Sequence, residues 1–343
     1  MEHLGIVGFT GAGANRLFSA LTGLPAPSEY ESAVGVATVP DERLELLAEM
    51  SASKRVVPAG FQLVHLALPA GAKPGEGLGA KLLGELRGSD AILVVLRAAP
   101  ESGVVADPAG DLDALELELV LADLATVEQR LERQRRASKG DKTLGAELAA
   151  LERARDALGA GEAVSRAGLD DAELTALAPC FLLTLKPRLV VLNTGDGSAD
   201  GSGALASRLG PEALVVPVDV EAEIAACEPD DRAEMREMYG ITEPALDRVA
   251  HAAYHLLGRR TFLTTGDKES RAWTFRAGAK APECAGVIHS DLQRGFIRAE
   301  VIRWDELLPI GSWSAAREQG KLRVEGKDYE VADGDVLEIR FNV

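Results

Sequence analysis

Several features that mark specialised protein classes are missing from this chain. It contains only three cysteines (Cys180, Cys227 and Cys284), which are far apart and form no C-x-x-C pair. We therefore expect neither a disulfide framework nor a cysteine zinc site. No run of about eighteen apolar residues occurs, and no charged leader precedes an apolar stretch, which predicts a cytoplasmic protein without a membrane partner.

Positive charge is also scarce. The 37 Lys and Arg residues stand against 54 Asp and Glu residues, which gives a formal net charge of −17 over 343 residues. A surface that binds nucleic acid everywhere needs an excess of cations, so DNA is not an expected partner, although a local cationic patch is compatible with this total. A chain that is 46% hydrophobic and 27% charged is typical of folded proteins, and its length predicts two or three domains.

The apolar pattern predicts an α/β core. Residues 3–7 form a short strand-like run that leads into a glycine-rich turn, and Leu17 and Leu21 follow at helical spacing. Residues 91–96, 189–192 and 213–218 are continuous apolar runs of strand length. Such runs are typical of parallel strands that helices cover on both faces.

A long insertion between two of these strands has helical character. Leucines repeat every three or four residues from about residue 111, and again after the polar segment 138–142, so residues 111–179 are predicted to contain an antiparallel helical hairpin. The first helix ends in a group of cations: Arg130, Arg133, Arg135, Arg136 and Lys139. This group is either a solvated helix end that suits the helix dipole or a contact for RNA phosphate or an acidic partner.

The glycine-rich turn has the spacing of a phosphate-binding loop. Gly8 and Gly13 give G-x-x-x-x-G between a strand and a helix, with Gly11 inside it, and backbone N–H groups in such a loop can hold phosphates. The loop normally continues with Lys and then Ser or Thr, whereas this chain has Ala14 and Asn15. Arg16 could replace the missing cation, but a residue two places further along a helix points about 200° around it.

Long strings of residues resemble the YchF family, the Obg-like ATPases. The strings are TFLTTGDKESRAWT (261–274), APECAGVIHSD (281–291), RGFIRAEV (294–301), DGD (333–335), FNV (341–343), GITEP (240–244), LTLKP (183–187), GEGLG (75–79) and PDERL (40–44). The resemblance covers essentially the whole chain. It implies a P-loop NTPase-type α/β domain formed by residues 1–110 and 180–260, a coiled-coil-like helical insert at 111–179, and a small α+β, β-grasp-like TGS domain at 261–343.

The chain departs from this family where the family handles nucleotide. His65 stands where the resemblance implies the Asp of an Asp-x-x-Gly element, and histidine does not supply the carboxylate that Mg²⁺ prefers. Residues 30–35 lack the switch-one Thr before Pro-Asn, residues 98–103 lack a histidine, and residues 217–221 are shortened. Asn193 and Asp196 still resemble the base-reading Asn-x-x-Asp loop. We therefore expect at most weak binding of ATP or GTP and no firm magnesium site.

Three functions stay open at this stage. The leading hypothesis is a YchF-like scaffold or binding protein that does not hydrolyse nucleotide and contacts a ribosome, RNA or a translation-associated protein, as the family implies. The second is an ATPase or GTPase in which Arg16 or a partner supplies the cation, and the third is a weak nucleotide sensor. The candidate partner-binding cations are Arg133, Arg135, Arg136, Lys268, Arg271, Arg294 and Arg298.

Overall fold

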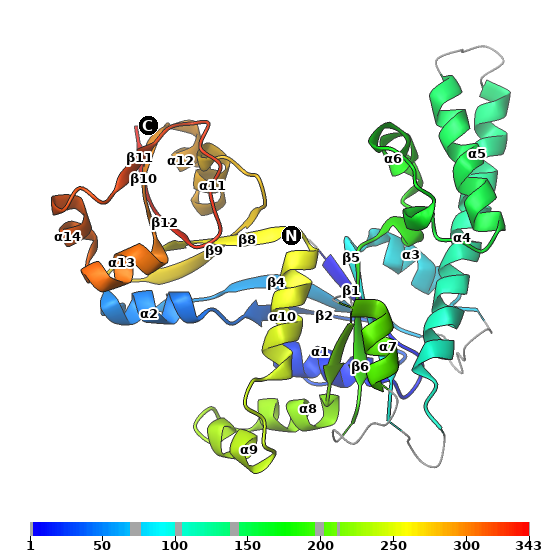
Figure 1. The fold of residues 1–343 in the computed structure, drawn as a ribbon, viewed down its shortest axis with the longest axis horizontal. Helices are drawn as coiled ribbons and strands as arrows, with labels where there is room; N and C mark the ends of the chain where they lie inside the picture. The colour runs from blue at the N-terminus through cyan, green and yellow to red at the C-terminus, as the bar shows by residue number, and fades with distance from the viewer. Residues whose placement is uncertain are drawn as a thin grey trace. The chain divides into compact units, whose positions relative to one another are not determined.

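The computed structural model describes residues 3–68, 77–99, 105–137, 144–195, 202–210 and 213–342 (Figure 1). Contacts divide the chain into two compact units. The first unit comprises Met1–Gly35 and Gln62–Val249, and the second comprises Val36–Phe61 and Ala250–Val343. The sequence placed residues 36–61 with the nucleotide-binding part, whereas their contacts group them with the C-terminal part; the finer domain boundaries stay a prediction.

The first unit is built on a sheet with the strand order β2-β4-β1-β5-β6-β7, although the residues of β2 and β4 that fall within 36–61 are grouped with the second unit. The strands are β1 (His3–Val7), β2 (Ala33–Val39), β4 (Ala59–His65), β5 (Ala91–Arg97), β6 (Arg188–Asn193) and β7 (Ala213–Val216). Parallel pairing joins β1 to β4 and β5, β5 to β6, and β6 to β7. The predicted α/β fold class is confirmed, and the carboxyl ends of these strands meet at one edge of the sheet.

Helices cover the strands β1, β5 and β6 because these strands are buried on both faces. Ile92, Val94 and Leu96 of β5 pack with leucines of α3 (Ala80–Gly88), α4 (Pro108–Ala137) and α7 (Ser202–Leu209) in one buried cluster. On α1 (Ala14–Thr22), Leu17 and Phe18 are fully buried, and this helix contacts α8 (Val218–Ala226). The unit also contains α9 (Arg232–Met238) and the start of α10 (Ala245–Leu256).

The helical insertion consists of α4 and α5 (Gly145–Gly159), which pack along each other (Figure 1). Helix α4 begins at Pro108, three residues before the predicted start. The Asp107 side chain accepts a hydrogen bond from the Gly110 N–H (2.9 Å), and proline suits the first helical position. Short elements follow the hairpin: η2 (Val164–Arg166), α6 (Asp171–Leu177), η3 (Ala178–Cys180) and η4 (Leu183–Leu185).

The second unit contains a mixed sheet with the order β11-β10-β12-β8-β9-β3. Its elements are α2 (Glu42–Met50), β3 (Val56–Val57), β8 (Arg259–Thr264), β9 (Ser270–Arg276), α11 (Ala281–Ile288), α12 (Ser290–Arg294), β10 (Phe296–Arg303), α13 (Trp304–Ile310), α14 (Trp313–Glu318), β11 (Arg323–Glu325) and β12 (Asp335–Phe341). Phe262, Phe275, Cys284 and Leu337 are buried in its core. Burial raises the pKa of the Cys284 thiol to about 12, so this cysteine stays protonated at neutral pH.

Hydroxyl groups attach the 51–53 turn to the β8–β9 connection inside this unit. Ser51 Oγ lies 2.7 Å from Thr265 Oγ1, and Ser53 Oγ lies 2.8 Å from Ser270 Oγ. Strand β3 also pairs in parallel with the start of β9. These contacts explain why residues 36–61 group with the C-terminal part. No periodic pattern in the sequence predicts these contacts.

A buried carboxylate joins the hairpin to the segment that leads into β6. Asp123 of α4 is fully buried, and its two oxygens accept hydrogen bonds from the backbone N–H groups of Leu183 (2.9 Å) and Thr184 (2.8 Å). Burial raises the pKa of Asp123, while the two N–H donors oppose this shift. The side chain thus satisfies two buried backbone donors that would otherwise have no acceptor.

Asp123→Ala should lower the free energy of unfolding by about 2–4 kcal/mol, because each buried donor left without an acceptor costs about 1–3 kcal/mol. Chemical denaturation of both proteins measures this difference. Asp113→Ala is the control on the same helix, since Asp113 is 71% exposed and meets Arg208 only at 3.8 Å. A surface ion pair of this kind contributes about 0–1 kcal/mol. Equal losses in the two variants would contradict the assigned role of Asp123.

Candidate functional site

The glycine loop lies between the end of β1 and the start of α1, as the sequence predicted. Gly13 has φ of 86° and stands at the helix N-cap, and Gly11 has φ of 79°. A Cβ on Gly8 would lie 2.6 Å from the Val95 carbonyl oxygen, and one on Gly13 would lie 2.5 Å from Asn193 Nδ2. The backbone conformation and the close approach of neighbours both require glycine here.

Asn193, at the end of β6, holds this loop against two others. Its Nδ2 donates a hydrogen bond to the Ala12 carbonyl (3.0 Å), and its Oδ1 accepts from the N–H groups of Gly195 (2.9 Å) and Val218 (3.2 Å). The side chain is 6% exposed. Asn193 therefore joins the glycine loop, its own loop and the start of α8. Asp196 lies outside the described residues.

The two residues that replace Lys and Ser are turned toward the protein. Ala14 is 9% exposed. Asn15 Nδ2 donates a hydrogen bond to the Pro27 carbonyl (3.2 Å), and its Oδ1 accepts from the Arg16 N–H (2.9 Å). Both polar atoms of Asn15 thus have a protein partner, and neither residue brings a positive charge to the loop.

Arg16 has an acidic partner outside the loop. Its guanidinium forms an ion pair with Asp219 in the first turn of α8. The side chains of Arg16 and Asp219 are 54% and 42% exposed. An Arg16 that acted on phosphate at the loop would have to leave this partner.

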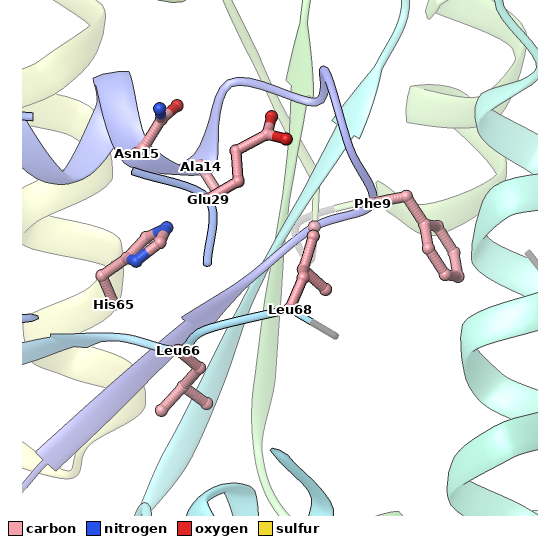
Figure 2. A pocket seen from close by; sticks show the side chains of 8 residues that line it. Phe9, Ala14, Asn15, Glu29, His65, Leu66 and Leu68 are labelled. Carbon is pink, nitrogen blue, oxygen red and sulfur yellow. The ribbon is translucent and has the colours of Figure 1, made fainter. Parts of the chain in front are cut away.

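An acidic side chain, that of Glu29, also reaches the glycine loop. Its Oε1 accepts a hydrogen bond from the Gly11 N–H (2.8 Å), and its backbone carbonyl accepts from the Leu68 N–H (2.9 Å). Figure 2 shows the Glu29 carboxylate beside the turn that precedes Ala14. One of the loop's N–H groups therefore already donates to an anion from the protein itself.

His65 occupies the end of β4 and is 3% exposed. Its Nδ1 lies 2.9 Å from the Glu31 carbonyl oxygen. A carbonyl can only accept, so Nδ1 carries the proton of the neutral ring. Burial is the main cause that lowers the pKa of His65 below its ordinary value. The imidazole is therefore neutral at pH 7, and its protonated Nδ1 is not available to coordinate a metal.

A small pocket lies between these residues. Its lining residues are Gly8, Phe9, Ala14, Asn15, Glu29, His65, Leu66 and Leu68 (Figure 2). It holds about 220 Å³ of non-atom space, part of it open to solvent. The lining contains one acid and no Lys or Arg. Among the described residues, no group of three or more His, Cys, Asp and Glu could hold a metal ion.

Several candidate partner-binding cations are already paired with acids. Arg135 meets Glu152 at 2.7 Å, Arg136 pairs with Glu132, Arg271 meets Glu269 at 3.0 Å, and Arg294 pairs with Asp291. Arg133, Lys268 and Arg298 are exposed and have no ion pair within the described part of the chain. The hairpin cluster is thus a salt-bridged helix surface for most of its length. Lys139 lies outside the described residues.

Sequence reasoning missed Glu29 and Asp219. Glu29 lies in a proline-containing segment between α1 and β2, and its contact with Gly11 joins two loops that no periodic pattern relates. Asp219 was noticed only as part of a shortened stretch. Acids near a presumed phosphate site were the available signal, but spacing alone does not place them.

Gly13→Ala should lower the free energy of unfolding by about 2–5 kcal/mol. The left-handed backbone costs an alanine about 1–2 kcal/mol, and crowding against Asn193 adds about 1–3 kcal/mol. Gly23→Ala separates these causes, because Gly23 has φ of 69° but no neighbouring atom within 4 Å of the place where a Cβ would lie. It should show the backbone part alone. Denaturation curves in which the two variants lose equal stability would contradict the contact with Asn193.

His65 should make the fold less stable in mild acid. A lowered folded pKa means that the unfolded chain binds more protons, so stability is lost as pH falls below the ordinary value of 6.5. The loss reaches at most about 1.4 kcal/mol per pH unit. Urea denaturation at pH 7.5 and 5.5 should show a smaller pH effect in His65→Asn, whose Nδ2 can still donate to Glu31. An unchanged pH effect would contradict the assignment.

Comparisons with known proteins agree along the whole chain. Residues 260–342 match the family model YchF-GTPase_C, described as a protein of unknown function (DUF933). The "Ribosome-binding ATPase YchF" of Bacillus subtilis (strain 168) is 40% identical over 361 residues, and that of Haemophilus ducreyi is 42% identical over 360 residues. Each alignment covers 99% of both chains.

A solved structure gives the same answer for the fold. The YchF GTPase of Schizosaccharomyces pombe matches with a TM-score of 0.87 at 26% identity, covering 99% of this chain and 97% of that chain. In the part of the chain that the structure describes, no helix is long and apolar enough to cross a membrane. The likeness to these relatives extends over nearly the full length of each chain, so it includes the strand–loop–helix site, the inserted hairpin and the C-terminal sheet. This chain therefore belongs to the YchF family.

Proposed function

We propose that this chain is a ribosome-associated member of the YchF family whose nucleotide site does not support hydrolysis of ATP or GTP. The relatives' names, ribosome-binding ATPase, support the ribosome as partner. The single observation that supports a site without hydrolysis is its charge: the acid Glu29 reaches the glycine loop, and no Lys or Arg lines the pocket.

Phosphoryl transfer depends on positioned positive charge around the terminal phosphate. The residues present do not fit this need. Ala14 removes the lysine, whose charge-assisted hydrogen bond would contribute about 1.5–3 kcal/mol, or roughly one to two decades of affinity. Asn15 uses its side chain on Pro27, and neutral His65 offers no carboxylate to Mg²⁺. The site therefore lacks the groups that would hold magnesium and the terminal phosphate for hydrolysis.

A second function is favoured by the intact backbone of the loop. Gly13 keeps the left-handed conformation of the turn, and Asn193 holds the loop in place. A nucleotide could then bind weakly through loop N–H groups without a metal, which would make the site a sensor. An active hydrolase, the third function, requires either that Arg16 exchanges Asp219 for phosphate or that a partner supplies the cation.

We also propose that residues 261–343 form a TGS-type domain and that exposed cations contact the partner. Arg133, Lys268 and Arg298 are the best candidates, because acids already pair with Arg135, Arg136, Arg271 and Arg294. A cation that forms no ion pair with an acid of the protein can bind RNA phosphate without first giving up that partner.

The purified chain should sediment with ribosomes to the same extent with and without ATP, and it should release no phosphate above a protein-free control. Magnesium should not change the phosphate release, because the site lacks the groups that hold it. Sedimentation in a salt series and a phosphate-release assay give the two measurements.

Lys268→Glu combined with Arg298→Glu should weaken this sedimentation, whereas Arg271→Glu combined with Arg294→Glu should weaken it less. Magnesium-dependent phosphate release by the unmodified chain would refute the non-hydrolysing site. Sedimentation that occurs only with ATP would refute a nucleotide-independent partner role.

A further inference from the structure

We propose that Glu29 is an internal anion that occupies the glycine loop and decides which ligands the loop accepts. The loop takes a free oxyanion such as pyrophosphate, or the phosphates of a nucleotide, only where the Glu29 carboxylate has left or an uncharged side chain replaces it. This inference rests on the proposed function, because it names what keeps phosphate out of the same site.

The contact itself is well placed to exclude phosphate. The Gly11 N–H donates to Glu29 Oε1 at 2.8 Å, and Gly11 has φ of 79°, a conformation that fixes where its N–H points. The start of α1 adds the positive end of a helix dipole, which favours one negative group at this position. A carboxylate and a phosphate are both anions, so they compete for these donors.

The backbone on both sides of Glu29 holds the carboxylate near the loop. Asn15 Nδ2 donates to the Pro27 carbonyl at 3.2 Å, and the Leu68 N–H donates to the Glu29 carbonyl at 2.9 Å. His65 Nδ1 donates to the Glu31 carbonyl at 2.9 Å. The segment is thus attached to the start of α1 through Pro27 and to the end of β4 and the residues after it through Glu29 and Glu31.

The surroundings do not compensate the charge of Glu29. None of the eight residues that line the pocket is a Lys or Arg. Arg16, two residues after Ala14, is paired with Asp219. A phosphate that approached the loop would therefore meet an acid without a neighbouring cation among the residues that line the pocket. A family lysine at position 14 would have changed this balance, and this chain has alanine there.

Two substitutions separate the charge of Glu29 from its shape. Glu29→Gln keeps an oxygen that accepts from Gly11 but removes the negative charge, and Glu29→Ala removes both. Glu31→Ala is the matched control, because it deletes the same charge two residues away. Glu31 is exposed, and its contact with His65 uses the backbone carbonyl that alanine retains.

Calorimetric titration of the full-length, nucleotide-free chain with pyrophosphate, without magnesium, tests the proposal. Both Glu29 variants should bind about tenfold or more tightly than the unmodified chain, the range expected when a charge-assisted hydrogen bond becomes available. Glu31→Ala should bind like the unmodified chain. Melting curves with and without pyrophosphate show that each variant is folded, and the Glu29 variants alone should gain melting temperature.

Three results would overturn the proposal: no gain in either Glu29 variant, an equal gain in Glu31→Ala, or a gain in Glu29→Ala without one in Glu29→Gln. The last result would mean that the bulk of the side chain, and not its charge, blocks the loop. These outcomes are independent of the proposed function, which fails on phosphate release by the unmodified chain. The same titration with ATP shows whether the opened loop accepts a whole nucleotide.

Discussion

The hydrogen bonds of the Asn193 side chain are the interaction on which the candidate site depends. One amide group at the end of β6 meets the carbonyl of Ala12 and the N–H groups of Gly195 and Val218. The close approach is possible because Gly13 has no Cβ. The glycine loop, the loop after β6 and the start of α8 are therefore placed by a single buried side chain, and Asn15 and Arg16 follow this loop directly.

The polar groups around the loop find partners within the protein. Gly11 donates to Glu29, Asn15 donates to Pro27, and His65 meets Glu31. A nucleotide site in a hydrolase uses charged groups that are completed by ligand and metal, whereas these three groups already have partners within the protein. The fold consequently does not need a ligand to satisfy these groups, which agrees with a part that serves mainly as a scaffold.

Much of the fold could be predicted from the sequence because strands that are buried on both faces consist of continuous apolar residues. Residues 91–96 and 189–192 lie in parallel strands as expected, and the leucine repeat gave the hairpin, although Asp107 and Pro108 mark the true start of α4. The glycines of the loop were also recognised. Glu29 was not, since a contact between two loops follows no period. The ion pair between Arg135 and an acid on α5 could not be predicted either, because the number of cations in a segment does not show which acids lie beside them.

The hydrogen bonds of Asp123 connect the hairpin with the segment that leads into β6. The bonded turn η4 ends at Leu185, and β6 begins at Arg188, so only two residues separate the base of the hairpin from the strand that carries Asn193. The bonds of Asp123 and those of Asn193 therefore hold the two ends of one short segment, residues 183–193, which connects α4 with the glycine loop.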